Sequence, residues 1–102
     1  MPKRFDINSV KQTLAAIKPQ LAERFSVERI GVFGSTVRGE ATEASDVDIL
    51  IDYNPSSTLS LFDIVTLEEE LSALLQAKVD IVTLPALKRR IGEQIMREVE
   101  FV

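Results

Sequence analysis

Apolar residues recur every three or four positions near the start of the chain, which is the spacing of one face of an α-helix. The residues with this spacing are Ile7, Val10, Leu14, Ile17 and Leu21. Pro19 falls inside the pattern, and a proline in a helix interior removes a backbone hydrogen bond and clashes with the preceding turn. We therefore expect a helix that begins near Ile7 and ends near Lys18, followed by a short turn.

Three short runs farther along the chain have the apolar, β-branched composition of strands. They are ERIGVFGS, which Gly34 stops, SDVDILIDY and KVDIVTL. The segment NPSST after the second run predicts a turn. Ser60 and Asp63 then form the signature of a capping box at a helix N-terminus. The apolar face of that helix would consist of Ile64, Leu67, Leu71 and Leu74.

The C-terminal part of the chain predicts one more helix. Pro85 suits its first position, and Leu87, Ile91 and Ile95 would form its buried stripe. The tail EVEFV alternates apolar and acidic residues, which fits either a short edge strand or a docking segment. The order helix, strand, strand, helix, strand, helix predicts a single α/β (α+β) domain over residues 1–102, with a small mixed sheet flanked by helices.

The composition narrows the chemistry that is available to this domain. None of the 102 residues is Cys or His, which excludes thiol nucleophiles, His-based triads and the usual zinc sites. Any metal must therefore be held by oxygen. The 12 basic and 16 acidic residues give a net charge of −4, which disfavours stable nucleic-acid binding. No apolar run reaches the ~20 residues that span a bilayer, so we expect a cytoplasmic protein without a membrane segment.

Two aspartates open the second predicted strand. Asp46 and Asp48 are one residue apart, so both side chains point to one face of the strand, while Val47 and Ile49 point to the core. Two ionised carboxylates this close repel each other, and burial would raise the pKa of at least one. A divalent cation between them removes that conflict, and oxygen ligands favour Mg²⁺ or Mn²⁺. Because Mg²⁺ is commonly shared between carboxylates and phosphates, the pair points to a nucleotide.

Ten residues separate Asp46 from a Gly-Ser pair. Gly34 would end a strand and let a phosphate come close, and Ser35 would cap a short helix and offer its hydroxyl. Arg38 lies one helical turn later and would reach the same phosphates with its planar guanidinium group. Gly39 would end the helix. Each feature alone is more common as a plain turn or a solvated charge. Their combination favours a triphosphate site beside a metal-binding pair.

This pattern resembles the signature of the nucleotidyltransferases related to DNA polymerase beta. The resemblance rests on Gly34-Ser35, ten intervening residues that include Arg38-Gly39 and Ser45, and Asp46-x-Asp48. The short chain and the run FGSTVRGEATEASDVDILI are similar to the minimal nucleotidyltransferases, the antitoxin partners of HEPN-domain proteins. The motif covers about a fifth of the chain, and the order of elements extends the likeness over nearly all of it.

The resemblance implies a site with two Mg²⁺ ions, or Mn²⁺ in their place, that clamp the attacking and leaving oxygens. Asp46 and Asp48 would hold the ions together with a third carboxylate on a neighbouring strand. The candidate is Asp80 in KVDIV, which would also help to take the proton of the acceptor hydroxyl. A charge at the strand edge that pairs with Lys78 is the alternative for Asp80.

The resemblance also implies a reaction. Gly34, Ser35 and Arg38 would bind the phosphates of the nucleotide, and AMP would pass from ATP to a hydroxyl of a partner protein. That partner would be a HEPN-domain toxin, neutralised on a tyrosine, in a hetero-oligomer with this chain. Two alternatives stay open: an antitoxin that only masks its partner, and a small-molecule nucleotidyltransferase of the antibiotic-modifying kind. Three carboxylates argue against pure masking, and the lack of an acceptor domain argues against the second.

Overall fold

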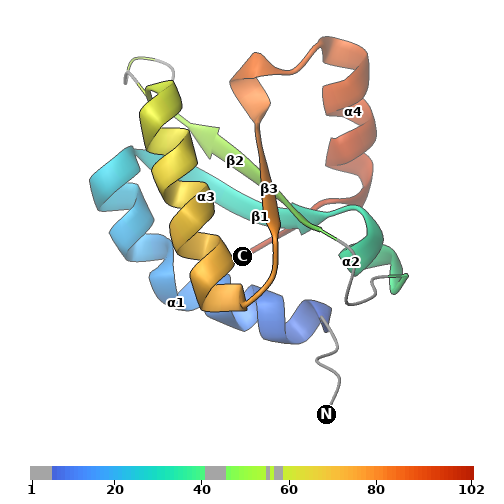
Figure 1. The fold of residues 1–102 in the computed structure, drawn as a ribbon. Helices are drawn as coiled ribbons and strands as arrows, with labels where there is room; N and C mark the ends of the chain where they lie inside the picture. Colours follow the sequence, from blue (N-terminus) through green and yellow to red (C-terminus); the bar gives the residue numbers. More distant parts are fainter. Residues whose placement is uncertain (1–5, 41–45, 55, 57–58) are drawn as a thin grey trace.

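A computed structural model of the protein describes residues 6–40, 46–54, 56 and 59–102, and Figure 1 shows their arrangement. The elements in chain order are α1 (Ile7–Phe25), β1 (Val27–Phe33), α2 (Ser35–Arg38), β2 (Val47–Tyr53), α3 (Leu61–Leu75), β3 (Val79–Thr83), the 3₁₀ turn η1 (Leu84–Ala86), α4 (Arg89–Glu98) and β4 (Glu100–Phe101). The turn predicted at positions 54–58 lies in large part outside the described residues.

The strands form one mixed sheet in the order β3-β2-β1-β4. β1 is antiparallel to β2 and to β4, whereas β2 and β3 are parallel and joined through α3. α1 and α3 lie side by side on one face of the sheet, and α4 lies on the other side (Figure 1). The predicted mixed sheet flanked by helices is confirmed, and the C-terminal tail is an edge strand.

The main core lies between the sheet and the helices α1 and α3. Val47, Ile49 and Ile51 of β2 are buried there with Leu67 and Leu71 of α3. Alternate positions of β2 point to the opposite face. The core therefore fixes the direction in which the polar residues of β2 must point.

The helix α1 does not end before Pro19, so the prediction of a break near Lys18 is wrong. α1 runs on to Phe25, and its buried stripe includes Leu21 and Phe25 beyond the proline. Burying one large apolar side chain gains about 1.5–3 kcal/mol, and two of them outweigh the ~3 kcal/mol that proline costs in a helix. Pro19 itself faces solvent, so its ring does not disturb the core.

The predicted stripe of the last helix is also corrected. Pro85 lies in the 3₁₀ turn η1, Leu87 precedes α4, and Ile91 is 47% exposed. The buried residue of α4 is Gly92, and a Cβ added there would lie in ordinary van der Waals contact with Leu84 and Leu87. The helix therefore approaches its neighbours through a glycine, which turns the adjacent Ile91 to solvent.

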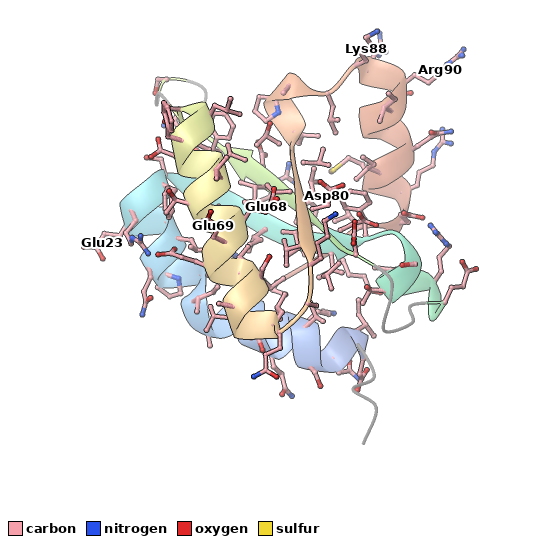
Figure 2. The ribbon with its side chains drawn as sticks, in the orientation of Figure 1. Glu23, Glu68, Glu69, Asp80, Lys88 and Arg90 are labelled. Atoms are coloured by element: carbon pink, nitrogen blue, oxygen red, sulfur yellow. The ribbon has the colours of Figure 1, made fainter. Side chains whose placement is uncertain are left out.

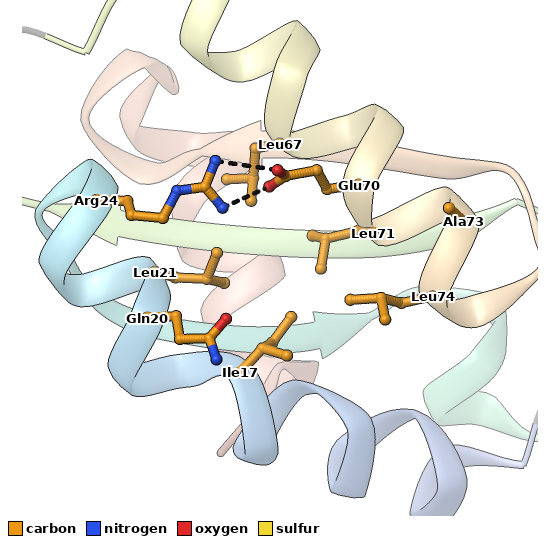
Figure 3. Close-up of a pocket in the computed structure, with 9 residues that line it drawn as sticks. All are labelled: Ile17, Gln20, Leu21, Arg24, Leu67, Glu70, Leu71, Ala73 and Leu74. Atoms are coloured by element: carbon orange, nitrogen blue, oxygen red, sulfur yellow. Dashed lines mark hydrogen bonds and ion pairs between the residues drawn. The ribbon is translucent and has the colours of Figure 1, made fainter.

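The helix α3 begins as predicted, with a capping box in which Ser60 and Asp63 bond reciprocally. Leu67 and Leu71 are buried, but Leu74 is 53% exposed. Leu74 borders a groove of about 310 Å³ between α1 and α3 that Arg24 and Glu70 bridge with two hydrogen bonds of 3.0 Å (Figure 3). This groove contains none of the predicted site residues.

Candidate functional site

The parallel pairing of β2 with β3 places two of the predicted carboxylates side by side. Asp48 is the direct partner of Asp80 in the register of the two strands. The flanking pairs, Val47 with Val79 and Ile49 with Ile81, have the opposite parity and face the core. Asp46 precedes the strand by one residue. The structure thus brings the third predicted carboxylate, which Figure 2 shows on β3, to the aspartate pair.

The environment of Asp48 disfavours its charged form. Partial burial raises the pKa of this carboxyl above its ordinary value, and the negative charges of Asp80 and Asp46 raise it further, while Arg38 acts in the opposite direction. A cation that binds at the site would stabilise the charged form of this carboxyl group.

We expect the substitution Asp48→Asn to stabilise the metal-free protein at neutral pH. Because folding raises the pKa of Asp48, the folded state favours protonation, and stability is lost as the pH rises through that raised value. The variant should melt about 2–5 °C higher at pH 7, a modest gain because the carboxylate is only partly buried. The gain should vanish as the pH falls toward the ordinary pKa of 3.8.

Thermal unfolding in EDTA at several pH values measures this effect. Asp52→Asn, on the same strand, is the matched control. Asp52 accepts a 2.8 Å hydrogen bond from Arg29, so its replacement should not raise the melting temperature. Equal melting of wild type and Asp48→Asn at pH 7 would show that the carboxylates do not strain the folded state.

The alternative role of Asp80 was an ion pair with Lys78. Lys78 does not form this pair. Its ammonium lies 4.0 Å from Asp46, and Lys78 is 79% exposed, so this contact is weak. Among the described residues, Asp80 has no hydrogen-bond or ion-pair partner. In the same part of the chain, no three acidic side chains are gathered as a ligand set for one ion. The carboxylates adjoin one another without converging on one point.

The turn between β1 and α2 lies against Asp48. Gly34 has a φ of +78°, which a residue with a side chain rarely adopts, and a Cβ at this position would collide with the Asp48 carboxylate. Glycine is therefore required at position 34 for two reasons, the backbone conformation and the close approach of Asp48. Gly34, rather than Ser35, is the N-cap of α2, and Ser35 is its first residue. Gly39 ends α2 with a φ of +74°, as expected. Ser45 lies outside the described residues.

Glu98, at the end of α4, is a site residue that the sequence did not indicate. It accepts hydrogen bonds of 2.8 Å from the Gly34 N–H and 3.1 Å from Arg38 Nη1. Glu98 is 64 positions away from Gly34 and belongs to no local motif. Only the folded chain brings them together.

Comparisons with known proteins agree with this geometry. The model of the nucleotidyltransferase domain family matches residues 14–102. The chain belongs to this family. It is 48% identical over 96 residues to the protein adenylyltransferase MntA of Thermococcus cleftensis, and the match covers 94% of this chain and 95% of that protein.

Solved structures show the same fold. One, described as a minimal nucleotidyltransferase, has a TM-score of 0.76 and 37% identity and covers 93% of this chain and 94% of its own. A chain from a complex of a tri-AMPylated HEPN toxin of Shewanella oneidensis with an MNT antitoxin has a TM-score of 0.66. It is 20% identical and covers 90% of this chain and 70% of its own, so it supports the fold alone. No described helix is both long and apolar enough to cross a membrane.

Proposed function

We propose that this member of the family is a Mg²⁺-dependent protein adenylyltransferase. It transfers AMP from ATP to a hydroxyl, most simply that of a tyrosine, on a HEPN-type toxin, and so acts as an antitoxin. The observation that carries the proposal is the pairing of Asp48 with Asp80 on adjacent strands, next to Asp46 and the Gly34 turn. The 48% identity to a protein adenylyltransferase supports the same chemistry.

The donor set fits a divalent cation. Asp46, Asp48 and Asp80 supply only oxygen, which Mg²⁺ and Mn²⁺ prefer, and partial burial together with the charges of Asp80 and Asp46 raises the pKa of Asp48, which a bound cation would offset. Asp46, Asp48 and Asp80 adjoin one another and would together hold the two ions. When bound, the ions neutralise charge on the phosphates and orient the reacting oxygens.

The remaining roles fall to side chains of this chain. Ser35 and Arg38 bind the β- and γ-phosphates, and the glycine at position 34 lets the triphosphate lie close to the backbone. The acceptor oxygen forms a new bond to the α-phosphorus as the bond from that phosphorus to the α,β-bridging oxygen breaks. Pyrophosphate leaves with the electron pair, and Asp80 takes the proton of the acceptor hydroxyl.

The acceptor comes from another molecule. The nucleotidyltransferase domain takes up residues 14–102, and the described elements form one sheet with its helices, so we expect the acceptor site on a partner. A structural relative is a complex of an AMPylated HEPN toxin with an MNT antitoxin, which makes a toxin of that class the partner to test first. The cytoplasm, which supplies ATP, is the expected compartment.

Intact-mass spectrometry of the cognate toxin tests this function. After incubation with wild-type protein, ATP and Mg²⁺, the toxin should gain the mass of one or more AMP groups. The modified toxin should stay inactive after the antitoxin has been removed. A toxin that is inhibited without any mass gain, and that recovers on separation, would establish masking instead.

Nucleotide binding should depend on the metal. Calorimetric titration with ATP should give an affinity at least about tenfold higher with Mg²⁺ than with EDTA, because three carboxylates otherwise repel the triphosphate. Mn²⁺ should restore binding. Equal affinity with and without EDTA would remove the metal site from the proposal.

A further inference from the structure

The direction of the Gly34 N–H bond shows which element fixes the turn between β1 and α2. Val102 donates a hydrogen bond to the carbonyl of Ile30 over 3.0 Å, so Ile30 points its backbone groups toward β4. Alternate residues of a strand point their backbone groups to the same side. Gly34 therefore points its N–H toward β4 and α4 rather than toward β2. The two-residue strand β4 does not extend as far as Gly34. The side chain of Glu98 accepts the hydrogen bond from the Gly34 N–H instead.

The same carboxylate fixes Arg38. Arg38 donates from Nη1 to Glu98 over 3.1 Å and from Nε to Glu40 over 3.2 Å. Glu98 and Glu40 thus accept hydrogen bonds from two nitrogens of the Arg38 guanidinium, and neither glutamate bonds to Nη2. These contacts restrict the rotamers of Arg38 before any ligand arrives, while its side chain remains 48% exposed.

Space for a ligand lies beside these contacts. A hollow of about 510 Å³ borders Gly34, Arg38 and Glu98. Of the proposed nucleotide site, the hollow includes Gly34 and Arg38 but none of the three aspartates. On its other side the turn touches Asp48, so Glu98 sets the position of Gly34 relative to the carboxylates.

We propose that Glu98 is a positioning residue for the nucleotide. It holds the Gly34 backbone and the Arg38 guanidinium from α4, so that both stand ready for the triphosphate beside Asp48. The inference rests on the proposed function, in which Arg38 binds phosphate. Glu98 does not itself contact the nucleotide and acts through its two hydrogen-bond donors.

Calorimetric titration of the full chain with Mg²⁺ and AMP-PNP, a non-hydrolysable ATP analogue, tests this role. Glu98→Ala should weaken binding about tenfold, the loss expected when a charge-assisted contact no longer orders the site. Glu98→Gln should restore part of the affinity, because its amide oxygen still accepts from Gly34. In an Arg38→Ala background, Glu98→Ala should cost clearly less, about threefold, because only the Gly34 N–H is left for Glu98 to act through.

Glu93→Ala is the matched control, since Glu93 also lies on α4 but pairs with Arg89. Unchanged or tighter binding by both Glu98 variants would overturn the inference, and tighter binding would mean that Glu98 competes with phosphate. Equal losses with and without Arg38 would reduce Glu98 to a structural contact. If wild type does not bind the analogue, the proposed function fails and this inference with it; if wild type binds, the variants decide the inference alone.

Discussion

Replacing Asp46 and Asp48 together with asparagine should abolish AMP transfer and leave a folded protein. The two side chains would hold the metal ions, and the loss of even one group that stabilises a transition state commonly costs about 10²–10³ in rate. The substitutions also remove the partly buried carboxylate of Asp48, whose pKa is raised by its burial and by the neighbouring negative charges, so the metal-free fold should not suffer. Rates of toxin modification, measured by intact mass, and the melting temperature together check both parts.

The matched control removes two charges elsewhere. Glu23→Gln with Glu69→Gln alters exposed residues of α1 and α3, which Figure 2 shows on the outer sides of these helices. This variant should modify the toxin at the wild-type rate. If the double asparagine variant still adds AMP, the metal-binding role of the pair is refuted. If it adds none but still neutralises the toxin, binding alone explains the neutralisation.

Asp80→Asn should slow transfer at least about a hundredfold while most nucleotide affinity remains. The asparagine keeps the shape of Asp80 but can neither take the acceptor proton nor hold a cation as a carboxylate does. Binding should survive because Ser35, Arg38 and the pair at the start of β2 are untouched. Single-turnover modification of the toxin and calorimetric titration with Mg²⁺ and AMP-PNP separate the two quantities.

Asp52→Asn supplies the comparison, because Asp52 also lies on the sheet but pairs with Arg29. It should leave both rate and affinity near those of wild type. A wild-type transfer rate in Asp80→Asn would assign the proton acceptor to another group. A large loss of nucleotide affinity would instead give Asp80 a role in binding the nucleotide.

The sequence was sufficient where one local pattern determined one outcome. Alternation in SDVDILIDY predicted which face of β2 carries the carboxylates, and the capping box predicted where α3 begins. It failed where tertiary packing overrode a local preference. The burial of Phe25 carries α1 through Pro19, and the approach through Gly92 turns Ile91 outward.

The contact between Glu98 and the Gly34 turn shows a different limit. Neither residue indicates the other, because their meeting depends on where β4 and α4 lie against β1. The pairing of Asp48 with Asp80 lies between these cases. Each strand was recognisable, but the parallel register that makes the two aspartates neighbours required the structure.

Substitutions on the two faces of β2 should have different consequences for the protein. The core side, with Val47 and Ile49, supports folding, whereas on the opposite side the charge of Asp48 is disfavoured until a ligand binds. If a duplicated gene lost one of these aspartates, the encoded protein would therefore still fold and would keep any surface that binds a partner. Descendants of that kind would be recognisable by intact aliphatic positions beside a missing carboxylate. In such descendants the acidic positions, rather than overall similarity alone, would indicate whether catalysis is retained.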